Sequence, residues 1–198
     1  RSWRLATMRE RTADEMGLLV SELLERAGIR PAAVDGVVMA SVVPPLTASV
    51  IEMSERYLGT RPLNLEPGVN TGMPVLYDNP AEVGADRIVN SIAAYELYGR
   101  SRKMPLIVVD FGTATTFDAV STAGEYLGGV ICPGIQISAD ALFQRAAKLP
   151  RIDVRKPPHV IGKTTVSSMQ SGLFFGYVSM VEGLVRRMRA ELGGKAFC

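Results

Sequence analysis

Residues 105–118, PLIVVDFGTATTFD, carry the strongest fold signal in the sequence. The stretch opens with a continuous apolar run that is rich in β-branched side chains and ends at Asp110, which predicts a buried strand. A turn rich in glycine and threonine follows, and residues 115–120 predict a second strand. Residues 125–131 predict a third strand after a turn at residues 121–124. We therefore expect consecutive strands joined by short turns here.

Helical and strand patterns alternate on either side of this stretch. Thr12, with Glu15 three residues later, predicts a capping box at the start of a helix that ends near Gly28. Residues 66–80 are rich in proline and glycine and predict a long loop. The other predicted elements are strands at residues 2–7, 36–43 and 61–65, helices at residues 45–58, 81–98 (stopped by Gly99), 134–148 and 165–192, and a loop at residues 151–163.

This alternation of strands and helices predicts an α/β fold. We expect two α/β halves, residues 1–100 and residues 101–198. The second half contains a run of three predicted strands followed by a helix. The first half would contain the same run if two strands preceded Ser2. No repeat is visible in the sequence itself.

The composition is that of an ordinary globular protein. Of the 198 residues, 47% are apolar and 21% are charged, and the net charge is +2 without a long basic run. Neither nucleic acid nor a membrane is therefore an expected partner. The two cysteines, Cys132 and Cys198, do not provide a secreted disulfide framework, which favours a cytoplasmic protein. The single histidine, His159, excludes sites that need two or three histidines in one chain.

The first candidate site is the turn that follows Asp110. Gly112 allows a phosphate to approach the backbone closely, and the threonines around it add hydroxyl donors. Asp110 would hold a cation or a water beside that phosphate. The alternative is an ordinary hairpin with an aspartate near its turn, and the motif alone leaves both interpretations open.

The second candidate site is the pair Asp86-Arg87, in the first turns of the helix after the long loop. An arginine there can hold a carboxylate through two hydrogen bonds, and an adjacent aspartate can accept a proton from a hydroxyl. The alternative is a solvated ion pair on a helix surface, and for the pair alone this is the more common case.

A third motif, Gly162-Lys-Thr-Thr165, suggests a P-loop but fails the pattern. A P-loop has a glycine five residues before Gly162, and Pro157 occupies that position. Thr164 and Thr165 are then expected to cap the following helix. Cys132 is expected to be a buried small residue and not a nucleophile.

Taken together, these segments resemble type III pantothenate kinases, also called Bvg accessory factor-like proteins. The resemblance runs over essentially the whole chain in the family's order, and this joint occurrence is far more specific than any single motif. The matching segments are RERTAD (9–14), SVVP (41–44), TGMPVLYDNP (71–80), GADR (84–87), DFGTATT (110–116), GGVICPG (128–134) and SMQSG (168–172).

The resemblance implies an actin-like, sugar-kinase-like (ribonuclease H-like) duplicated α/β domain that works as a homodimer with a shared active site. The implied reaction is ATP-dependent phosphorylation of pantothenate to 4'-phosphopantothenate, the first step of coenzyme A biosynthesis. The implied cofactors are ATP with Mg²⁺ and a monovalent cation, K⁺ or NH₄⁺. Phosphoryl transfer requires in-line positioning and charge stabilisation, which agrees with the chemistry inferred from the two candidate sites.

The resemblance also assigns roles to individual residues. On the substrate side Asp86 would be the general base, Arg87 would hold the pantothenate carboxylate, Tyr77, Gly84 and Ala85 would line the pocket, and Thr165 would reach the pocket of the partner subunit. On the nucleotide side Gly112, Thr113 and Thr115 would bind ATP, and Asp110 would lie near the monovalent cation. Asp110 is also the alternative candidate for the base.

The sequence departs from the family's pattern at both ends. The family's first strand, with a D-x-G-N-T phosphate motif, is absent before Ser2, and its glycine-rich adenosine segment is absent after Cys198. We therefore expect a truncated kinase with reduced or no activity. The alternative is a non-catalytic relative that acts as a binding or transcription-accessory protein. Asp86 and Arg87 favour the enzyme, because a binding module has less need of a base beside a carboxylate clamp.

Overall fold

The computed structural model of the chain describes residues 1–41, 43–65 and 71–198. The chain divides into two compact units, which are described separately. The first unit comprises Arg1–Thr71 and Ala81–Val89, and the second comprises Gly72–Pro80 and Asn90–Cys198. Both units combine helices with a small sheet, so the predicted α/β class is confirmed. The duplicated architecture and the division at residue 100 stay predictions.

The first unit is built from two helices and a two-stranded parallel sheet. β1 pairs with β2 in the register Val38↔Leu63. The core contains Ala13, Met53 and Leu58. In chain order the elements are α1 (Ala13–Arg26), η1 (Pro31–Ala33), β1 (Val38–Ala40), α2 (Pro44–Met53), η2 (Ser54–Leu58) and β2 (Leu63–Leu65), with η3 (Pro80–Glu82) and the start of α3 (Ala85–Ala94) later in the chain.

Helix α1 begins as the sequence predicts. The Thr12 hydroxyl accepts a hydrogen bond from the Glu15 N–H at 3.2 Å, and Glu15 Oε2 accepts one from the Thr12 N–H at 2.8 Å. These two bonds form the capping box. The bonds from Thr12 also hold the pKa of Glu15 below its usual value. Gly28 follows the helix with a φ of 75°, a left-handed conformation that favours glycine.

Two strand predictions in this unit need correction. The predicted strand at residues 2–7 is wrong, because these residues are exposed and pair with no described strand. Of the predicted strand at residues 36–43, residue 42 lies outside the described residues, and the described part forms only β1, in which Met39 is the buried residue. A strand needs a partner that satisfies its backbone, and alternation of residue types alone does not supply one. Of the predicted loop, residues 66–70 lie outside the described residues.

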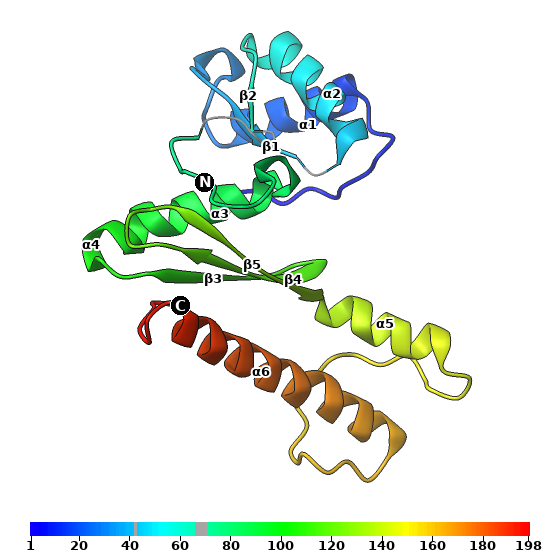
Figure 1. Cartoon of the computed structure of the whole chain (residues 1–198). Helices are drawn as coiled ribbons and strands as arrows, with labels where there is room; N and C mark the ends of the chain where they lie inside the picture. The colour runs from blue at the N-terminus through cyan, green and yellow to red at the C-terminus, as the bar shows by residue number, and fades with distance from the viewer. Residues whose placement is uncertain (42, 66–70) are drawn as a thin grey trace. The chain divides into compact units, whose positions relative to one another are not determined.

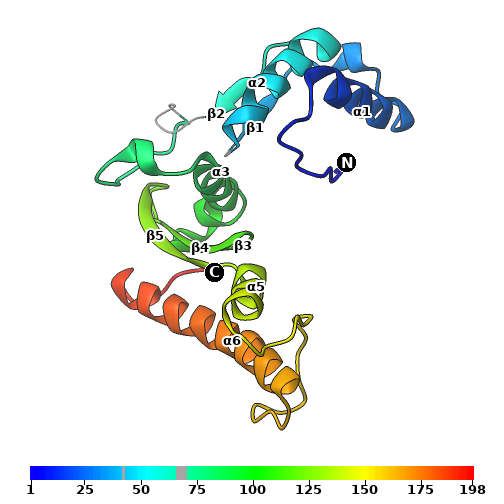
Figure 2. The same cartoon turned by 90° about the vertical axis from the view of Figure 1, so that its right-hand side faces the viewer.

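The second unit is built around an antiparallel sheet in the order β3-β4-β5. Figure 1 shows α6 along one face of this sheet and the helical segment that ends in α4 on the other, and Figure 2 shows the same layers after a quarter turn. The elements are η4 (Tyr95–Gly99), α4 (Arg100–Arg102), β3 (Leu106–Phe111), β4 (Ala114–Val120), β5 (Tyr126–Pro133), α5 (Ile135–Arg145) and α6 (Thr165–Glu191).

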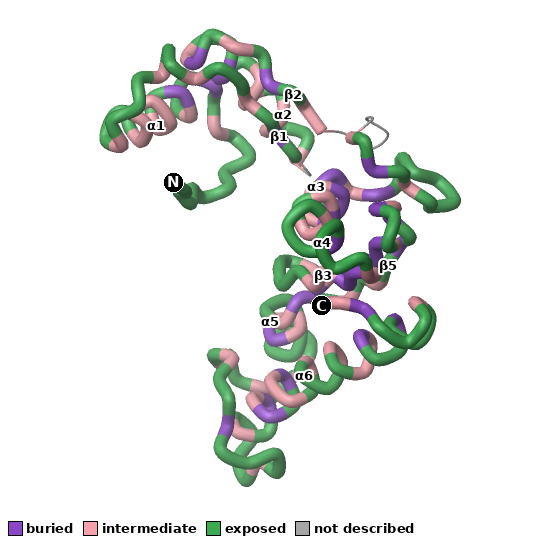
Figure 3. Tube along the Cα trace, turned by 90° about the vertical axis from the view of Figure 1, so that its left-hand side faces the viewer, coloured by how far each residue is buried: buried purple, intermediate pink, exposed green. Residues whose placement is uncertain are grey.

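Alternation along the strands divides the core of the second unit into two sides. Ile107, Phe117 and Ala119 pack with Val185 and Met188 of α6. Buried positions recur along the strands and at intervals along α6 (Figure 3). On the opposite face, the pair Leu106 and Val120 lies under the helical segment, since a Cβ at Gly99 would come within 3.0 Å of Leu106.

One helix boundary differs from the prediction. Gly99 does not end its helix, which continues through α4 to Lys103, where φ is 50°. Position 99 is a glycine because Leu106 approaches it closely, and not because the helix ends there. Helix α6 is continuous in spite of its internal glycines.

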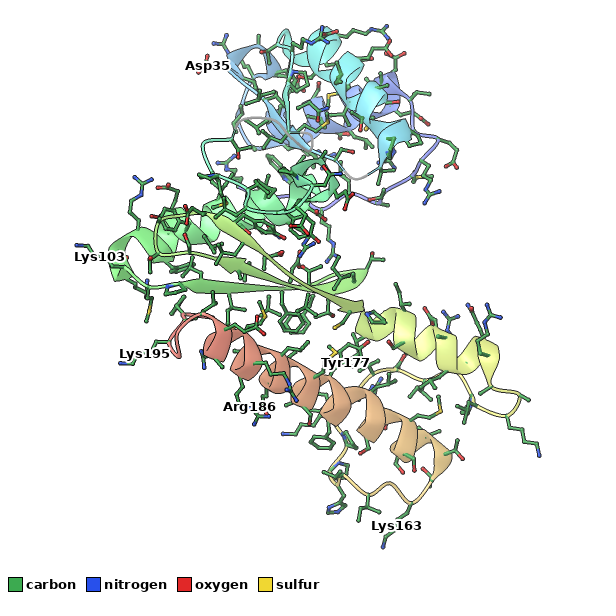
Figure 4. All side chains as sticks on the ribbon, viewed as in Figure 1. Asp35, Lys103, Lys163, Tyr177, Arg186 and Lys195 are labelled. Atoms are coloured by element: carbon green, nitrogen blue, oxygen red, sulfur yellow. The ribbon has the colours of Figure 1, made fainter. Side chains whose placement is uncertain are left out.

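Tyr177 connects α6 to β5 and α5. Its hydroxyl donates a hydrogen bond to the Pro133 carbonyl at 2.8 Å and contacts Ser138 of α5 (Figure 4).

The end of the chain extends the sheet by one residue pair. Phe197 forms a parallel bridge with Leu106, with hydrogen bonds from its N–H to Pro105 at 2.9 Å and from the Ile107 N–H to its carbonyl at 2.8 Å. The Arg102 guanidinium lies 4.3 Å from the centre of the Phe197 ring. This cation–π contact joins α4 to the end of the chain.

Substitution by alanine is expected to have opposite effects on stability at two helical glycines. A Cβ at Gly17 would lie 2.3 Å from the Tyr57 ring, whereas a Cβ at Gly183 meets nothing within 4 Å. We expect Gly17→Ala to destabilise the protein by about 1–3 kcal/mol through overpacking. The matched control Gly183→Ala is expected to be neutral or to stabilise it by up to about 1 kcal/mol. Urea unfolding measures both, and equal midpoints would contradict the close packing of Tyr57 on α1.

Candidate active site

The first turn of α3 carries four of the predicted site residues. The N–H groups of Arg87 and Ile88 reach the Gly84 carbonyl at 3.1 and 3.3 Å and close the turn. Ala85 is buried at 4% exposure, Asp86 is exposed, and Arg87 is only 9% exposed. The turn therefore presents a carboxylate to solvent beside a largely buried guanidinium.

The Asp86 carboxylate is held in one orientation by its own turn. Its Oδ1 atom accepts a hydrogen bond from the Arg87 N–H at 2.8 Å. A Cβ at Gly84 would lie 2.7 Å from the same oxygen. Position 84 is therefore a glycine because the folded-back carboxylate occupies the space of a side chain.

In the second unit, Asp110 lies near the end of β3 and is exposed. Its Oδ2 atom accepts a hydrogen bond from the Asn90 side-chain amide at 3.1 Å. In the sheet register Asp110 lies opposite Thr116. A carboxylate, an amide and a hydroxyl are thus brought to one region of one sheet face.

The turn after β3 is held tightly by the residue that follows β5. The Gly112 N–H donates to the Ala114 carbonyl at 3.0 Å, and the Gly134 N–H donates to the Thr113 carbonyl at 3.0 Å. A Cβ at Gly134 would lie 2.3 Å from the Thr113 carbonyl oxygen. Glycine is therefore required at position 134, and the exposed residues Gly112 and Thr113 have a fixed backbone.

Thr115 lies differently from the other residues of this turn. It is 1% exposed and lies opposite Phe111 and Cys132 in the sheet. Because side chains alternate along a strand, it shares the α6 side with Phe117 and not the face of Asp110. Its Oγ1 atom makes no hydrogen bond with the described residues. The role predicted for Thr115 as an ATP ligand stays a prediction.

Tyr77 lies beside the start of β5 in the second unit. Its side chain is 37% exposed, and the centre of its ring lies 6.4 Å from that of Tyr126. An isolated parallel bridge between Val75 and Tyr126 joins the preceding residues to the sheet.

Thr165 is the first residue of α6 and is exposed. Thr164 caps the helix as predicted, accepting a hydrogen bond from the Ser167 N–H at 3.1 Å. The apolar residues of α6 that pack in the core of the sheet begin at Val181, and Tyr177 reaches the end of β5 at Pro133. The start of α6, which carries Thr165, therefore lies away from the sheet of β3, β4 and β5 (Figure 1).

The type III pantothenate kinase family profile matches residues 1–187. A type III pantothenate kinase of Myxococcus xanthus is 60% identical over 191 residues, which cover 96% of this chain and 73% of that protein. The chain belongs to the type III pantothenate kinase family. The namesake from Anaeromyxobacter sp. (strain Fw109-5) is 59% identical over 96% of this chain and 74% of its own length. The type III pantothenate kinase of Moorella thermoacetica is 57% identical over 98% of this chain and 75% of its own length.

A solved structure of a Baf family protein from Campylobacter jejuni is a more distant match. It is 23% identical, covers 61% of this chain and 52% of its own length, and has a TM-score of 0.42. This likeness is too low to establish the duplicated fold.

Membership of the type III pantothenate kinase family confirms the resemblance found in the sequence. Two observations on the described residues stand beside it. No group of three or more histidine, cysteine, aspartate or glutamate side chains there could enclose a metal ion. None of the helices in the described part of the chain is long and apolar enough to cross a membrane.

Four residues next to the predicted site are not singled out by the sequence: Asn90, Asp118, Tyr126 and Gly134. Asn90 comes four residues after Asp86, and this helical spacing is a signal that could have identified it. Asp118 ends the motif that begins at Asp110, and alternation places it on the face of Asp110. Gly134 ends the matching segment GGVICPG, but its contact with the turn, like the contact of Tyr126 with Tyr77, involves residues distant in the sequence and has no local signal.

The contact of Gly134 with the turn gives a testable expectation. Gly134→Ala places a methyl group against the Thr113 carbonyl, so the turn must move, at a cost of about 1–3 kcal/mol. Urea unfolding measures the cost, and amide NMR shifts of Gly112 and Thr113 report the movement. Gly36→Ala is the control, since its Cβ meets nothing within 4 Å. Unchanged shifts in Gly134→Ala would contradict the described turn.

Proposed function

We propose that the reaction of this protein is transfer of the γ-phosphoryl group of ATP to the primary hydroxyl of pantothenate, forming 4'-phosphopantothenate for coenzyme A biosynthesis. The reduced or absent activity expected from the sequence stays a prediction. The observation that carries the proposal is the exposed Asp86 carboxylate beside the buried Arg87, in the GADR segment at the start of α3. The names of the relatives at 57–60% identity support the same reaction.

On the substrate side, Arg87 binds the pantothenate carboxylate and Asp86 acts as the base. A guanidinium can donate two parallel hydrogen bonds to a carboxylate, which fixes orientation as well as position. Asp86 accepts the proton of the primary hydroxyl while the oxygen of that hydroxyl attacks the γ-phosphorus of ATP. The bond from that phosphorus to the bridging oxygen breaks, and ADP leaves with the bonding pair. Gly84, Ala85 and Tyr77 line the pocket in this proposal.

On the nucleotide side, the turn of Gly112 and Thr113 binds the ATP phosphates, with Thr115 as the third proposed residue. The turn is held by Gly134, so it needs little reorganisation when a phosphate arrives. Asp110, with Asn90 beside it, offers oxygen ligands that suit K⁺ or NH₄⁺. Mg²⁺ usually binds through one or two carboxylates and the phosphates of the substrate, so it does not need an all-protein cage. Bound cations would supply charge neutralisation at the phosphates.

The proposal includes the finer architecture that the family resemblance implies. It takes residues 1–100 and 101–198 as halves of an actin-like duplicated domain in a homodimer. Thr165 then serves the pocket of the partner subunit, and its position away from the sheet of its own chain supports this assignment. Both cysteines are free thiols, which supports a reducing, cytoplasmic setting.

A non-catalytic binding or transcription-accessory role is the alternative. It leaves the folded-back carboxylate at Asp86 without a task, because ligand binding alone needs only the neighbouring arginine. A second alternative keeps the enzyme and makes Asp110 the base. Asp110 is anchored by the Asn90 amide, which suits a cation ligand that must be held in place.

Substituting each aspartate separately tests which one is the base. We expect Asp86→Asn to lower kcat by about 10²- to 10⁴-fold, the usual contribution of a general base, while pantothenate still binds. The Asp110→Asn variant should instead raise the concentration of monovalent cation needed for half-maximal rate. A coupled ADP-release assay measures rates, and isothermal titration calorimetry measures pantothenate binding where turnover is slow. Near-normal kcat in Asp86→Asn with no activity in Asp110→Asn would reverse the assignment.

The clamp is tested with a substitution that keeps the charge. Arg87→Lys retains a cation but loses the planar pair of donors. We expect pantothenate affinity to fall by about ten- to a hundredfold, which corresponds to one charged hydrogen bond. The affinity for the amide of pantothenate should fall much less, because that ligand lacks the carboxylate. Equal losses for both ligands would show that Arg87 does not bind the carboxylate.

A further inference from the structure

We infer that Asp118 and Tyr126 are positioning residues, which hold the Tyr77 side chain in place against pantothenate. The inference rests on the proposed function, in which Tyr77 lines the pantothenate pocket. All three residues belong to the second unit, and neither Asp118 nor Tyr126 contacts the substrate in that proposal.

The backbone of Tyr126 holds the segment that leads to Tyr77. The Tyr126 N–H donates to the Pro74 carbonyl at 2.8 Å, and the Leu76 N–H donates to the Tyr126 carbonyl at 2.8 Å. These two bonds form the isolated parallel bridge with Val75. The residue immediately before Tyr77 is therefore anchored to Tyr126 itself.

The side chains continue this link. The Tyr77 and Tyr126 rings lie 6.4 Å apart, centre to centre, and are inclined at 52°. A Cβ at Gly128 would lie 3.5 Å from the Tyr77 ring. Gly128 has a φ of 118° and follows a bulge in β5, so the strand bends where the Tyr77 ring lies against it.

A buried hydrogen bond fixes the Tyr126 ring. Its hydroxyl donates to Asp118 Oδ1 at 2.8 Å, and the two residues are 0% and 1% exposed. Burying a carboxylate is costly unless it is hydrogen-bonded, and apolar side chains at both positions would avoid that cost. Packing alone therefore does not account for the pair, whereas the need to hold the ring in one direction does.

The same carboxylate also links the substrate side to the cation side. Asp118 Oδ2 lies 3.5 Å from the Thr116 hydroxyl, and Thr116 lies opposite Asp110 in the sheet. Asp110, Thr116 and Asp118 share one sheet face, because they alternate with Phe117. Strand β4, which carries Thr116 and Asp118, is thus shared by the elements that position Tyr77 and Asp110.

The first experiment removes only the hydroxyl. In the full chain, Tyr126→Phe should weaken pantothenate binding by about tenfold, the size of one hydrogen bond, and leave ATP affinity unchanged. Tyr95→Phe is the matched control, since its hydroxyl donates to the Thr122 carbonyl at 3.3 Å in the same unit. Calorimetry measures the affinities, and urea unfolding records the stability of each variant. A less stable Tyr126→Phe variant with unchanged pantothenate affinity would mean that the pair is only structural.

A conservative substitution at the other end of the hydrogen bond provides a rescue. Asp118→Asn keeps an oxygen that accepts from Tyr126 and should retain most of the pantothenate affinity. Asp118→Ala removes the acceptor and should lose the affinity that Tyr126→Phe loses. Equal losses in both Asp118 variants would overturn the inference, because the acceptor oxygen would then not matter.

A spectroscopic readout separates this inference from the proposed function. With 3-fluorotyrosine incorporated, the ¹⁹F resonance of Tyr77, assigned with Tyr77→Phe, should move on adding pantothenate and should shift or broaden in Tyr126→Phe without ligand. An unchanged resonance in Tyr126→Phe would overturn the positioning role. Absence of pantothenate binding by the unsubstituted protein would overturn the proposed function and this inference with it. Normal binding with unchanged affinity in Tyr126→Phe would overturn only the inference.

Discussion

The second unit depends on the pairing of β3 with β4. The register Asp110↔Thr116 sends Asp110, Thr116 and Asp118 to one face, and Val109 and Phe117 to the side covered by α6. Phe117 is completely buried, so the apolar face fixes the register. A shift by one residue would exchange the two faces and bury the carboxylates against α6. The polar face of the candidate site is therefore maintained by packing on the opposite side of the same strands.

Features with a local cause are predictable from the sequence. The strands β3, β4 and β5 appear as apolar runs between turn residues, and the α1 capping box appears as Thr12 followed by Glu15. The helix turn that carries Asp86 and Arg87 is likewise formed within a few residues. In each case the contacts that determine the feature join residues that are close together in the sequence.

Features that depend on distant partners are not predictable in this way. The hydrogen bond from Asn90 to Asp110 spans 20 residues. The bridge between Val75 and Tyr126 joins a loop to a strand that lies much later in the sequence. The buried Thr115 lies opposite Cys132 of β5, which comes later along the sequence. Residues 2–7 show the reverse case, in which a strand-like pattern has no described partner. Sequence patterns report what a segment can form, whereas the partner decides whether it forms.

The two edges of the three-stranded sheet differ in how readily a further strand can pair with them. The β5 edge carries a bulge and the bent backbone at Gly128, which hinder a second strand from adding there. On the β3 edge, Phe197 pairs only with Leu106, and the rest of Leu106–Phe111 has no partner on that side among the described residues. A regular strand edge with unpaired backbone groups is a template for another chain. A further strand that adds to this sheet is therefore expected to pair along β3, beyond the point that Phe197 covers.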